Sequence, residues 1–160
     1  MRLVLNASPV ICLAKAGLID KVLSVAEEVV VPQLVADELL VANDKDAAVV
    51  WIQTEVGQHA LRYTKEAPAL VLAWDLGAGE SSVLAAVVDM PGSIAVLDDL
   101  AARRCAAALG IDFIGTLGLL LMAKKAGLIT SLRHALRAVV DAGLFVSPKH
   151  MHAILEAANE

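Results

Sequence analysis

The chain opens with Leu3-Val-Leu-Asn6-Ala-Ser8-Pro-Val-Ile-Cys-Leu-Ala14. Residues 3–5 form a short apolar run, which the polar and turn-forming residues 6–9 end. Residues 10–16 have the apolar character of a helix, and Gly17 is a natural C-terminal stop for that helix. The opening stretch therefore predicts a strand, a tight turn and a helix.

The same alternation of short strands and helices continues along the chain. Pro32 stands where a helix opens after a β-branched run, and Pro91-Gly92 turns the chain into another apolar run. Strands are expected at residues 3–5, 29–31, 59–63, 94–97 and 111–114, and helices at 10–16, 18–25, 33–41, 46–55, 80–88, 100–109, 116–126, 131–141 and 148–158. An apolar run that reaches Trp74 is ambiguous. The order predicts an α/β fold with a parallel sheet covered on both faces by helices.

Length and composition fit one domain. A chain of 160 residues buries roughly two thirds of its unfolded surface, and 58% hydrophobic residues against 19% charged ones exclude disorder. We expect a single domain over residues 1–160, with residues 128–160 as a helical C-terminal extension. The longest uncharged run, residues 3–14, is shorter than the roughly 20 residues that cross a bilayer, and the start does not resemble a signal peptide. We therefore expect a cytoplasmic protein without a membrane span.

Charge is unevenly distributed. Residues 1–100 carry 6 Lys and Arg against 14 Asp and Glu, whereas residues 101–160 carry 7 against 4, for a net charge of -5. An acidic surface repels nucleic acid unless cations neutralise it. Any nucleic-acid function therefore requires metal at the acidic sites and basic side chains nearby. The two cysteines, Cys12 and Cys105, are too far apart for a redox or zinc pair and are expected to be buried free thiols.

Candidate functional residues stand where strands end. In open α/β sheets the functional crevice lies beyond the carboxyl ends of the strands, which selects Asn6, Asp98 and Asp99. Glu38 and Glu80 follow loops at the same end of the sheet. Carboxylates that converge without Lys or Arg partners are stabilised by a hard divalent cation, Mg²⁺ or Mn²⁺. Such a site suits phosphodiester hydrolysis.

Each of these residues also has a structural interpretation. Glu80 at a helix start favours the helix dipole, Glu38 fits a solvated helix face, and Asp98 or Asp99 fits a helix cap. Asn6 fits a turn that its side chain stabilises through backbone hydrogen bonds. Taken singly, none of these residues decides between the structural and the functional interpretation.

Four motifs together carry the pattern of one known family. They are the opening stretch with Asn6 and Ser8, Val31-Pro-Gln-Leu-Val-Ala-Asp-Glu38-Leu39, Gly77-Ala-Gly-Glu80, and Ala95-Val-Leu-Asp98-Asp99-Leu-Ala-Ala-Arg103-Arg104. They resemble the PIN domains, the PilT N-terminus-like nucleases, along nearly the whole chain. Gly115-Thr-Leu-Gly118 before a Lys-Lys helix is similar to a prokaryotic branch of these proteins related to VapC-type toxins.

The resemblance implies a three-layer fold with about five parallel strands, often assembled as a homodimer. It implies catalysis by Asn6, Glu38, Glu80, Asp98 and Asp99, with Mg²⁺ or Mn²⁺ held by Asn6, Glu38, Glu80 and Asp99. Ser8 takes the family's hydroxyl position. VapC-type toxins cut RNA and are held inactive by an antitoxin, so an RNA substrate and an antitoxin partner are what the resemblance implies.

Asn6 departs from the family pattern, because a carboxylate is usual at this position. An amide carries no full negative charge, so metal affinity at this corner should be lower. Two hypotheses follow: a metal-dependent endoribonuclease, or a catalytically impaired module that binds RNA or a protein. A nucleotide or phosphoprotein switch on a similar sheet is disfavoured, since the chain has no phosphate loop.

Several other residues are weaker candidates. Arg103 and Arg104 follow Asp99 on a helix and are candidates for phosphate contact. His150 and His152 diverge on a helix and are expected at the surface rather than at a metal. The aromatic residues considered, Trp51, Tyr63 and Trp74, are too scattered for a base-stacking surface.

Overall fold

β1 (Arg2–Leu5) is an interior strand of a parallel sheet. The computed structural model describes residues 1–54, 57, 60 and 62–160. Within them the sheet has four strands in the order β2-β1-β3-β4. The other three strands are β2 (Glu28–Val30), β3 (Ser93–Val96) and β4 (Phe113–Ile114). Leu3 pairs with Val29 on one side and with Ile94 on the other. The first strand of the sequence therefore joins β2 to β3 in the sheet.

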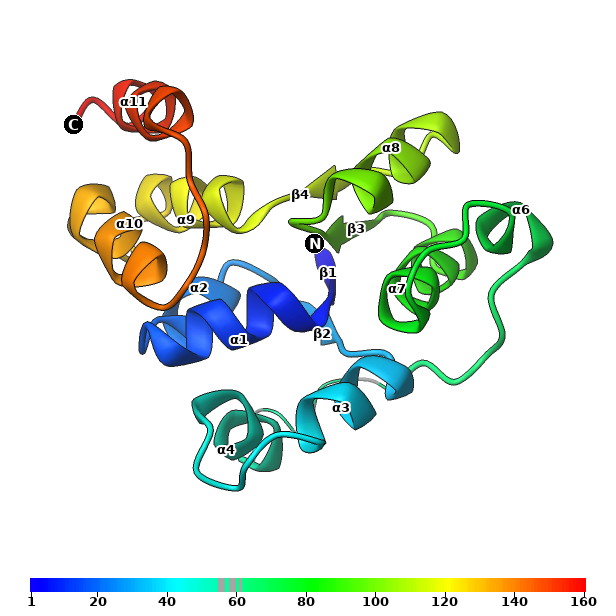
Figure 1. Ribbon diagram of the computed structural model, residues 1–160. Helices are drawn as coiled ribbons and strands as arrows, with labels where there is room; N and C mark the ends of the chain where they lie inside the picture. Colours follow the sequence, from blue (N-terminus) through cyan, green and yellow to red (C-terminus); the bar gives the residue numbers. More distant parts are fainter. Residues whose placement is uncertain (55–56, 58–59, 61) are drawn as a thin grey trace.

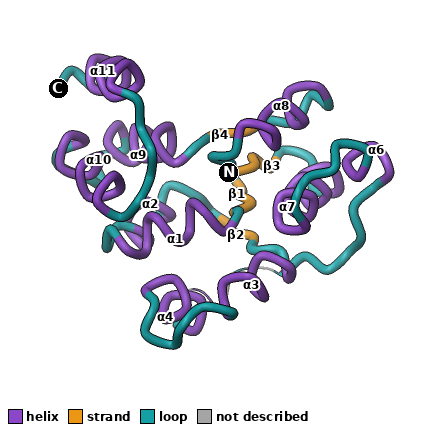
Figure 2. Tube along the Cα trace, in the orientation of Figure 1, coloured by secondary structure: helices purple, strands orange, loops and turns teal. Residues whose placement is uncertain are grey.

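Ten helices with assigned bounds surround the sheet in the described part of the chain. They are α1 (Ala7–Lys15), α2 (Ile19–Leu23), α3 (Gln33–Leu40), α4 (Ala47–Gln53), α6 (Ala69–Leu72), α7 (Ala78–Asp89), α8 (Leu100–Ala108), α9 (Thr116–Lys125), α10 (Leu132–Asp141) and α11 (Pro148–Glu156). Figure 1 shows α1, α2, α9 and α10 on one side of the sheet and α7 and α8 on the other. Figure 2 shows the strands together at the centre with helices around them. The predicted α/β fold, with a parallel sheet flanked by helices, is confirmed.

Burial explains why β1 is apolar at three consecutive positions rather than at alternate ones. Leu3, Val4 and Leu5 are all buried because helices cover both faces of the sheet. The same continuous apolar cluster includes Leu155 on α11. The C-terminal helices therefore add to the core that the sheet begins.

The first helix starts earlier than its apolar pattern indicates. α1 begins at Ala7, so Pro9 lies in its first turn. The amide hydrogens of a first turn have no partner inside the helix, so a proline there costs no hydrogen bond. The sequence prediction treated residues 6–9 as a turn and was wrong by three residues at this end. The ambiguous run before Trp74 contains the short helix α6.

The predicted strand at residues 59–63 is not found where the structure describes this segment. Residues 59 and 61 lie outside the described residues, as does residue 55 at the end of the helix predicted over 46–55. Arg62 and Tyr63 belong to no strand. The Tyr63 carbonyl instead accepts a hydrogen bond of 2.8 Å from the Gln33 amide at the start of α3. The backbone of Tyr63 therefore bonds to the N-terminus of α3 rather than to a neighbouring strand. The described sheet has four strands, whereas the resemblance implied about five.

Glu160 joins the C-terminal helices through its side chain. Its carboxylate accepts hydrogen bonds from the amides of Leu132 and Arg133 at 2.8 and 2.9 Å and pairs with Lys124 at 2.7 Å. These contacts, with Lys124 first, lower the pKa of Glu160 from 4.5 to about 2. A negative charge at a helix N-terminus is favourable, so this residue fixes α10 against α9.

We predict that this contribution to stability depends on pH. Because the folded pKa lies below the unfolded one, the stabilisation is complete above about pH 4.5 and is lost as the pH falls toward about 2. The free energy of unfolding, measured in urea, should be lower for Glu160→Gln than for the parent at pH 7. The difference should shrink over that interval. Glu156→Gln, which removes a charge from an exposed pair with His152, is the control; a pH-independent difference for Glu160→Gln contradicts the interpretation.

Candidate functional site

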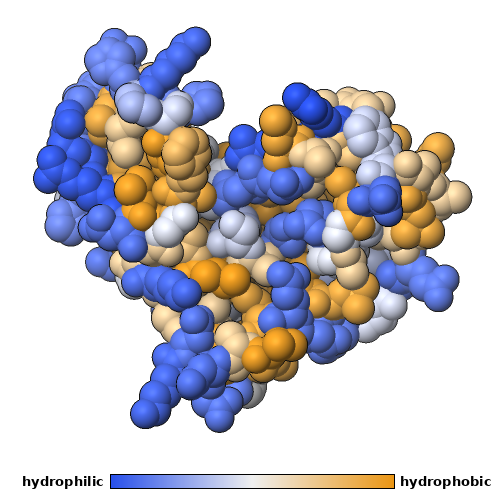
Figure 3. Space-filling model, in the orientation of Figure 1, coloured by the Kyte–Doolittle hydropathy of each residue, from blue (hydrophilic) through white to orange (hydrophobic). Residues whose placement is uncertain are grey.

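The structure brings the five acidic-site residues to one cavity. The cavity has a volume of about 780 Å³ and lies at the carboxyl ends of β1 and β3. Its lining includes Asn6, Glu38, Glu80, Asp98 and Asp99, together with Ser8 and Arg103. Arg104 is exposed and does not line it. Figure 3 shows hydrophilic residues at the centre of this face, flanked on both sides by hydrophobic surface.

Asn6 is buried at the end of β1, with only 3% of its surface exposed. It precedes α1 at the N-cap position, but its side chain makes no capping hydrogen bond. Its Nδ2 donates instead to Glu80 Oε1 at 3.2 Å. Its Oδ1 is buried and accepts no hydrogen bond from the described residues. The interpretation of Asn6 as a turn-stabilising side chain is therefore wrong, and its carbonyl oxygen is an unused acceptor inside the site.

Gly79 provides the space in which Glu38 and Asn6 approach each other. A Cβ atom on Gly79 would lie 2.9 Å from Glu38 Oε2 and 3.2 Å from Asn6 Oδ1. Both oxygens therefore face the same point beside the first turn of α7, where Glu80 follows. A side chain at this position would displace the Glu38 carboxylate from where it lies.

Glu38 and Glu80 form a like-charged pair. Burial, and secondly the negative charge of Glu80, raise the pKa of Glu38 above its ordinary value. Neither carboxylate pairs with a lysine or arginine in the described part of the chain. The amide of Asn6 donates to Glu80, and its oxygen lies beside Gly79 as Glu38 Oε2 does.

Asp98 is fully engaged in holding neighbouring elements together. Its Oδ1 accepts from the Thr116 amide at 2.8 Å and from Arg103 Nη2 at 3.4 Å, and its Oδ2 accepts from the Thr116 hydroxyl at 2.6 Å. Arg103 Nε donates in turn to the Leu97 carbonyl at 2.7 Å. Asp98 thus ties the end of β3 to α8 and to the start of α9.

Asp99 fits both the structural interpretation, as a helix cap, and the functional one, as a ligand. Its Oδ1 accepts from the Ala102 amide at 2.8 Å and caps α8. Its Oδ2 accepts no hydrogen bond from the described residues, and the residue is exposed at the cavity. One oxygen is therefore structural and the other is available to a ligand.

The donors at this site suit a hard cation. Amide and carboxylate oxygens are the ligands that Mg²⁺ and Mn²⁺ prefer, and the buried Oδ1 of Asn6 lacks a hydrogen-bond partner among the described residues. No three acidic, histidine or cysteine side chains of the described residues lie close enough to hold one ion as placed. Binding with three carboxylates therefore requires a side chain such as Asp99 to change rotamer.

Cys12 also lines the cavity but is a poor nucleophile. Burial, and secondly the charge of Asp98, raise the pKa of its thiol to about 11. Both cysteines are free and buried, as the sequence predicted. Thiolate chemistry at neutral pH is therefore disfavoured.

The sequence interpretation missed one wall of the cavity. Residues 142–147, which connect α10 to α11, line it together with His150. Phe145 in this connection is 90% exposed. Nothing in the local sequence signals this position, because the connection lies more than a hundred residues from Glu38 along the chain.

A family model described as a PIN domain matches residues 2–160. The chain belongs to the PIN domain family. This is a nuclease-type fold, and the resemblance inferred from the four motifs is confirmed at the level of the family. Comparison with curated proteins and comparison with solved structures gave no match. Among the described residues no helix has the length and apolar character needed to cross a membrane.

We predict that the tie between Asp98 and Thr116 supports the fold. Thr116 is fully buried and its hydroxyl donates to a charged carboxylate. Thr116→Val should therefore lower the free energy of unfolding by about 1.5–3 kcal/mol, measured in urea. Thr116→Ser keeps the hydroxyl and should lose only about 1 kcal/mol for the missing methyl group. A valine variant as stable as the parent would show that the hydroxyl is dispensable.

Proposed function

We propose that this PIN domain is a metal-dependent endoribonuclease whose Mg²⁺ or Mn²⁺ is held by Asn6, Glu38, Glu80 and Asp99. One observation carries the proposal: the buried Oδ1 of Asn6 accepts no hydrogen bond from the described residues and faces the same point as Glu38 Oε2. This point lies beside Glu80, whose carboxylate, like that of Glu38, forms no salt bridge with the described residues. A buried acceptor without a donor is costly. A cation at this point would satisfy the amide oxygen and neutralise the glutamates together.

When bound, such a cation supplies an activated water and stabilises charge on the phosphodiester. The chain's own residues hold the surrounding geometry. Asp98 and the Leu97 carbonyl fix Arg103 at the cavity, where its partly exposed guanidinium is available to a phosphate of the substrate. Ser8 stands exposed in the first turn of α1, at the same cavity, and offers a hydroxyl to the substrate.

Glu38→Gln tests the catalytic part of the proposal. Glu38 is exposed and makes no hydrogen bond to the described residues, so the substitution removes charge without removing a structural contact. The rate of cleavage of mixed RNA in Mn²⁺ should fall by at least about tenfold. Tenfold is the smallest loss of metal affinity or activity that is typical when a group supporting a metal site is removed. EDTA should abolish cleavage by the parent.

Asp37→Asn is the matched control for Glu38→Gln. It removes the same charge from the neighbouring position on α3, but Asp37 bonds to Gln33 and does not line the cavity. It should cleave at the rate of the parent. RNA cleavage that continues in EDTA, or a Glu38→Gln variant as active as Asp37→Asn, overturns the mechanism.

A second candidate function is a catalytically impaired module that binds RNA or a protein. The hydrogen bond from Asn6 Nδ2 to Glu80 favours it. An amide at this position stabilises one glutamate without any cation, which a carboxylate cannot do. The site is therefore less dependent on metal than an all-carboxylate site.

Asn6→Asp separates the two candidates. The change removes the hydrogen bond to Glu80 and adds a third negative charge, so in EDTA the free energy of unfolding should fall by about 1–3 kcal/mol. Mn²⁺ should restore more stability to this variant than to the parent, because it binds the folded state more tightly. Thermal unfolding with and without Mn²⁺ measures both effects.

Asn43→Asp is the control, since it makes the same change of amide to carboxylate at an exposed residue that lines neither cavity. If Asn6→Asp is as stable as the parent in EDTA, the Asn6–Glu80 bond does not hold the site. RNA cleavage that appears only in Asn6→Asp favours the impaired module, whereas cleavage by the parent excludes it.

Of three further proposals, two rest on the resemblance alone, and the third, the cytoplasmic location, rests on the sequence analysis. They are a role as the toxin of a toxin–antitoxin pair with an antitoxin partner, assembly as a homodimer, and a cytoplasmic location. The single domain over residues 1–160, with 128–160 as its extension, also stays a prediction.

A further inference from the structure

We propose that the connection between α10 and α11 binds an unpaired nucleobase of single-stranded RNA, with the Phe145 ring as the stacking surface. The inference deepens the proposed function and rests on it for the class of substrate. Among the large apolar side chains of the described residues Phe145 is the most exposed, at 90%. Single exposed apolar residues are ordinary. Phe145 differs from an isolated one because it lines the same cavity as the acidic cluster.

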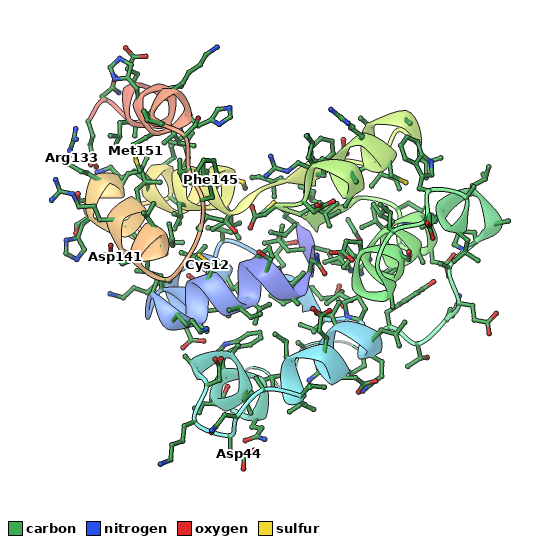
Figure 4. The ribbon with its side chains drawn as sticks, viewed as in Figure 1. Cys12, Asp44, Arg133, Asp141, Phe145 and Met151 are labelled. Carbon is green, nitrogen blue, oxygen red and sulfur yellow. The ribbon has the colours of Figure 1, made fainter. Side chains whose placement is uncertain are left out.

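The backbone holds Phe145 outward. Gly143 has a φ of 108°, which reverses the chain after α10. The Leu144 amide then donates to the Val139 carbonyl at 2.9 Å, and the Leu144 side chain packs against the core. Because Leu144 points inward, the next residue along the connection points outward. Figure 4 shows Phe145 on the connection between α10 and α11, with Cys12 below it on α1.

A second cavity extends the site away from the acids. It has a volume of about 330 Å³ and shares Arg103, Leu117 and His150 with the first. Its remaining wall is small or apolar and includes Gly118 and Ile154. The two cavities together form a groove with carboxylates at one end, a guanidinium and an imidazole in the middle, and apolar surface at the other end.

His150 is positioned rather than free at this junction. Its Nδ1 lies 3.1 Å from the Ser147 hydroxyl, and the same hydroxyl accepts from the His150 amide at 3.3 Å. Arg103 is fixed by Asp98 and by the Leu97 carbonyl. Two nitrogen-bearing side chains thus line the cavity that the acids and Phe145 also line, and they are available to a phosphate adjacent to a stacked base.

The arrangement fits a single strand rather than a duplex. A duplex keeps its bases stacked inside, so it presents no base face to Phe145. A single strand can turn an unpaired base onto an aromatic ring, and each such stack contributes about 5- to 150-fold in affinity. The ring tolerates any base, because every base has a π face.

Binding of a fluorescent single-stranded RNA in Ca²⁺ tests the inference, because Ca²⁺ is a hard cation that binds oxygen ligands and offsets the acids but replaces the Mg²⁺ or Mn²⁺ that the proposed cleavage needs. Phe145→Ala should weaken binding by about 5- to 150-fold, and Phe145→Trp should retain it. Phe145→Leu keeps an apolar side chain but no ring, and should lose most of the affinity that Phe145→Ala loses. Val41→Ala, at a comparably exposed position that lines neither cavity, should bind like the parent.

An RNA with abasic sites completes the test. The parent should bind it about as weakly as Phe145→Ala binds the normal strand, and Phe145→Ala should show little further loss. The inference is overturned if Phe145→Ala binds like the parent, or if double-stranded RNA binds equally well. It is also overturned if Phe145→Leu retains full affinity, since the position would then be an apolar docking point for a protein segment.

The outcome is separable from that of the proposed function. Glu38→Gln should bind the single strand and fail to cut it, whereas Phe145→Ala should bind weakly. If the parent does not cut RNA but Phe145→Ala still weakens RNA binding, the proposed nuclease function is wrong and the proposed stacking site stands. Because Phe145 is exposed, its variants should share the thermal unfolding midpoint of the parent, which excludes misfolding as the cause.

Discussion

The pairing of β1 with β3 is the constraint on which the site depends. Leu5 pairs with Val96, and the Asn6 amide donates to the Val96 carbonyl at 3.3 Å. The parallel pairing thus extends one residue beyond β1. It places Asn6 beside the carboxyl end of β3, which Asp98 follows in the sequence. Buried strands cannot slip, because a shift of one residue would leave backbone groups unpaired in an apolar core. The register therefore places Asn6 beside the end of β3 without any contact between their side chains.

A cluster of carboxylates opposes folding unless something offsets their repulsion, and this chain uses a different device for each acid. Asp98 is neutralised by Arg103 and by two donors from Thr116. Asp99 places one oxygen on the N-terminus of α8, where the helix dipole favours it. Glu80 accepts from Asn6. Glu38 alone has no such donor, and partial burial of its carboxyl group, with the charge of Glu80, raises its pKa. The chain thus folds with the acids in place while keeping oxygens free for a ligand.

The sequence predicted most elements because their signals are local. Pro32 before α3 and Gly110 after α8 mark helix boundaries through their own backbone preferences, and both boundaries fell within a residue of the prediction. The strand expected near Tyr63 failed because the carbonyl of that residue bonds to the distant Gln33 amide. Family motifs could select the acidic residues, but no motif could show that Asp98 is engaged by Thr116 or that Phe145 borders the same cavity. Those facts depend on contacts between distant parts of the chain, which only the folded structure establishes.

The charge of the chain also limits how the proposed RNA substrate would be bound. With a net charge of -5 and acids concentrated before residue 100, attraction between a basic surface and phosphates cannot supply most of the affinity. A bound cation would offset the acids locally, and Arg103 with His150 adds positive or hydrogen-bonding groups at one point only. The remaining free energy must come from the bases, through contacts that do not depend on charge. An exposed ring at the rim of the acidic cavity meets that requirement. The acidic composition, which alone argues against nucleic-acid binding, is therefore compatible with a single strand held by its bases.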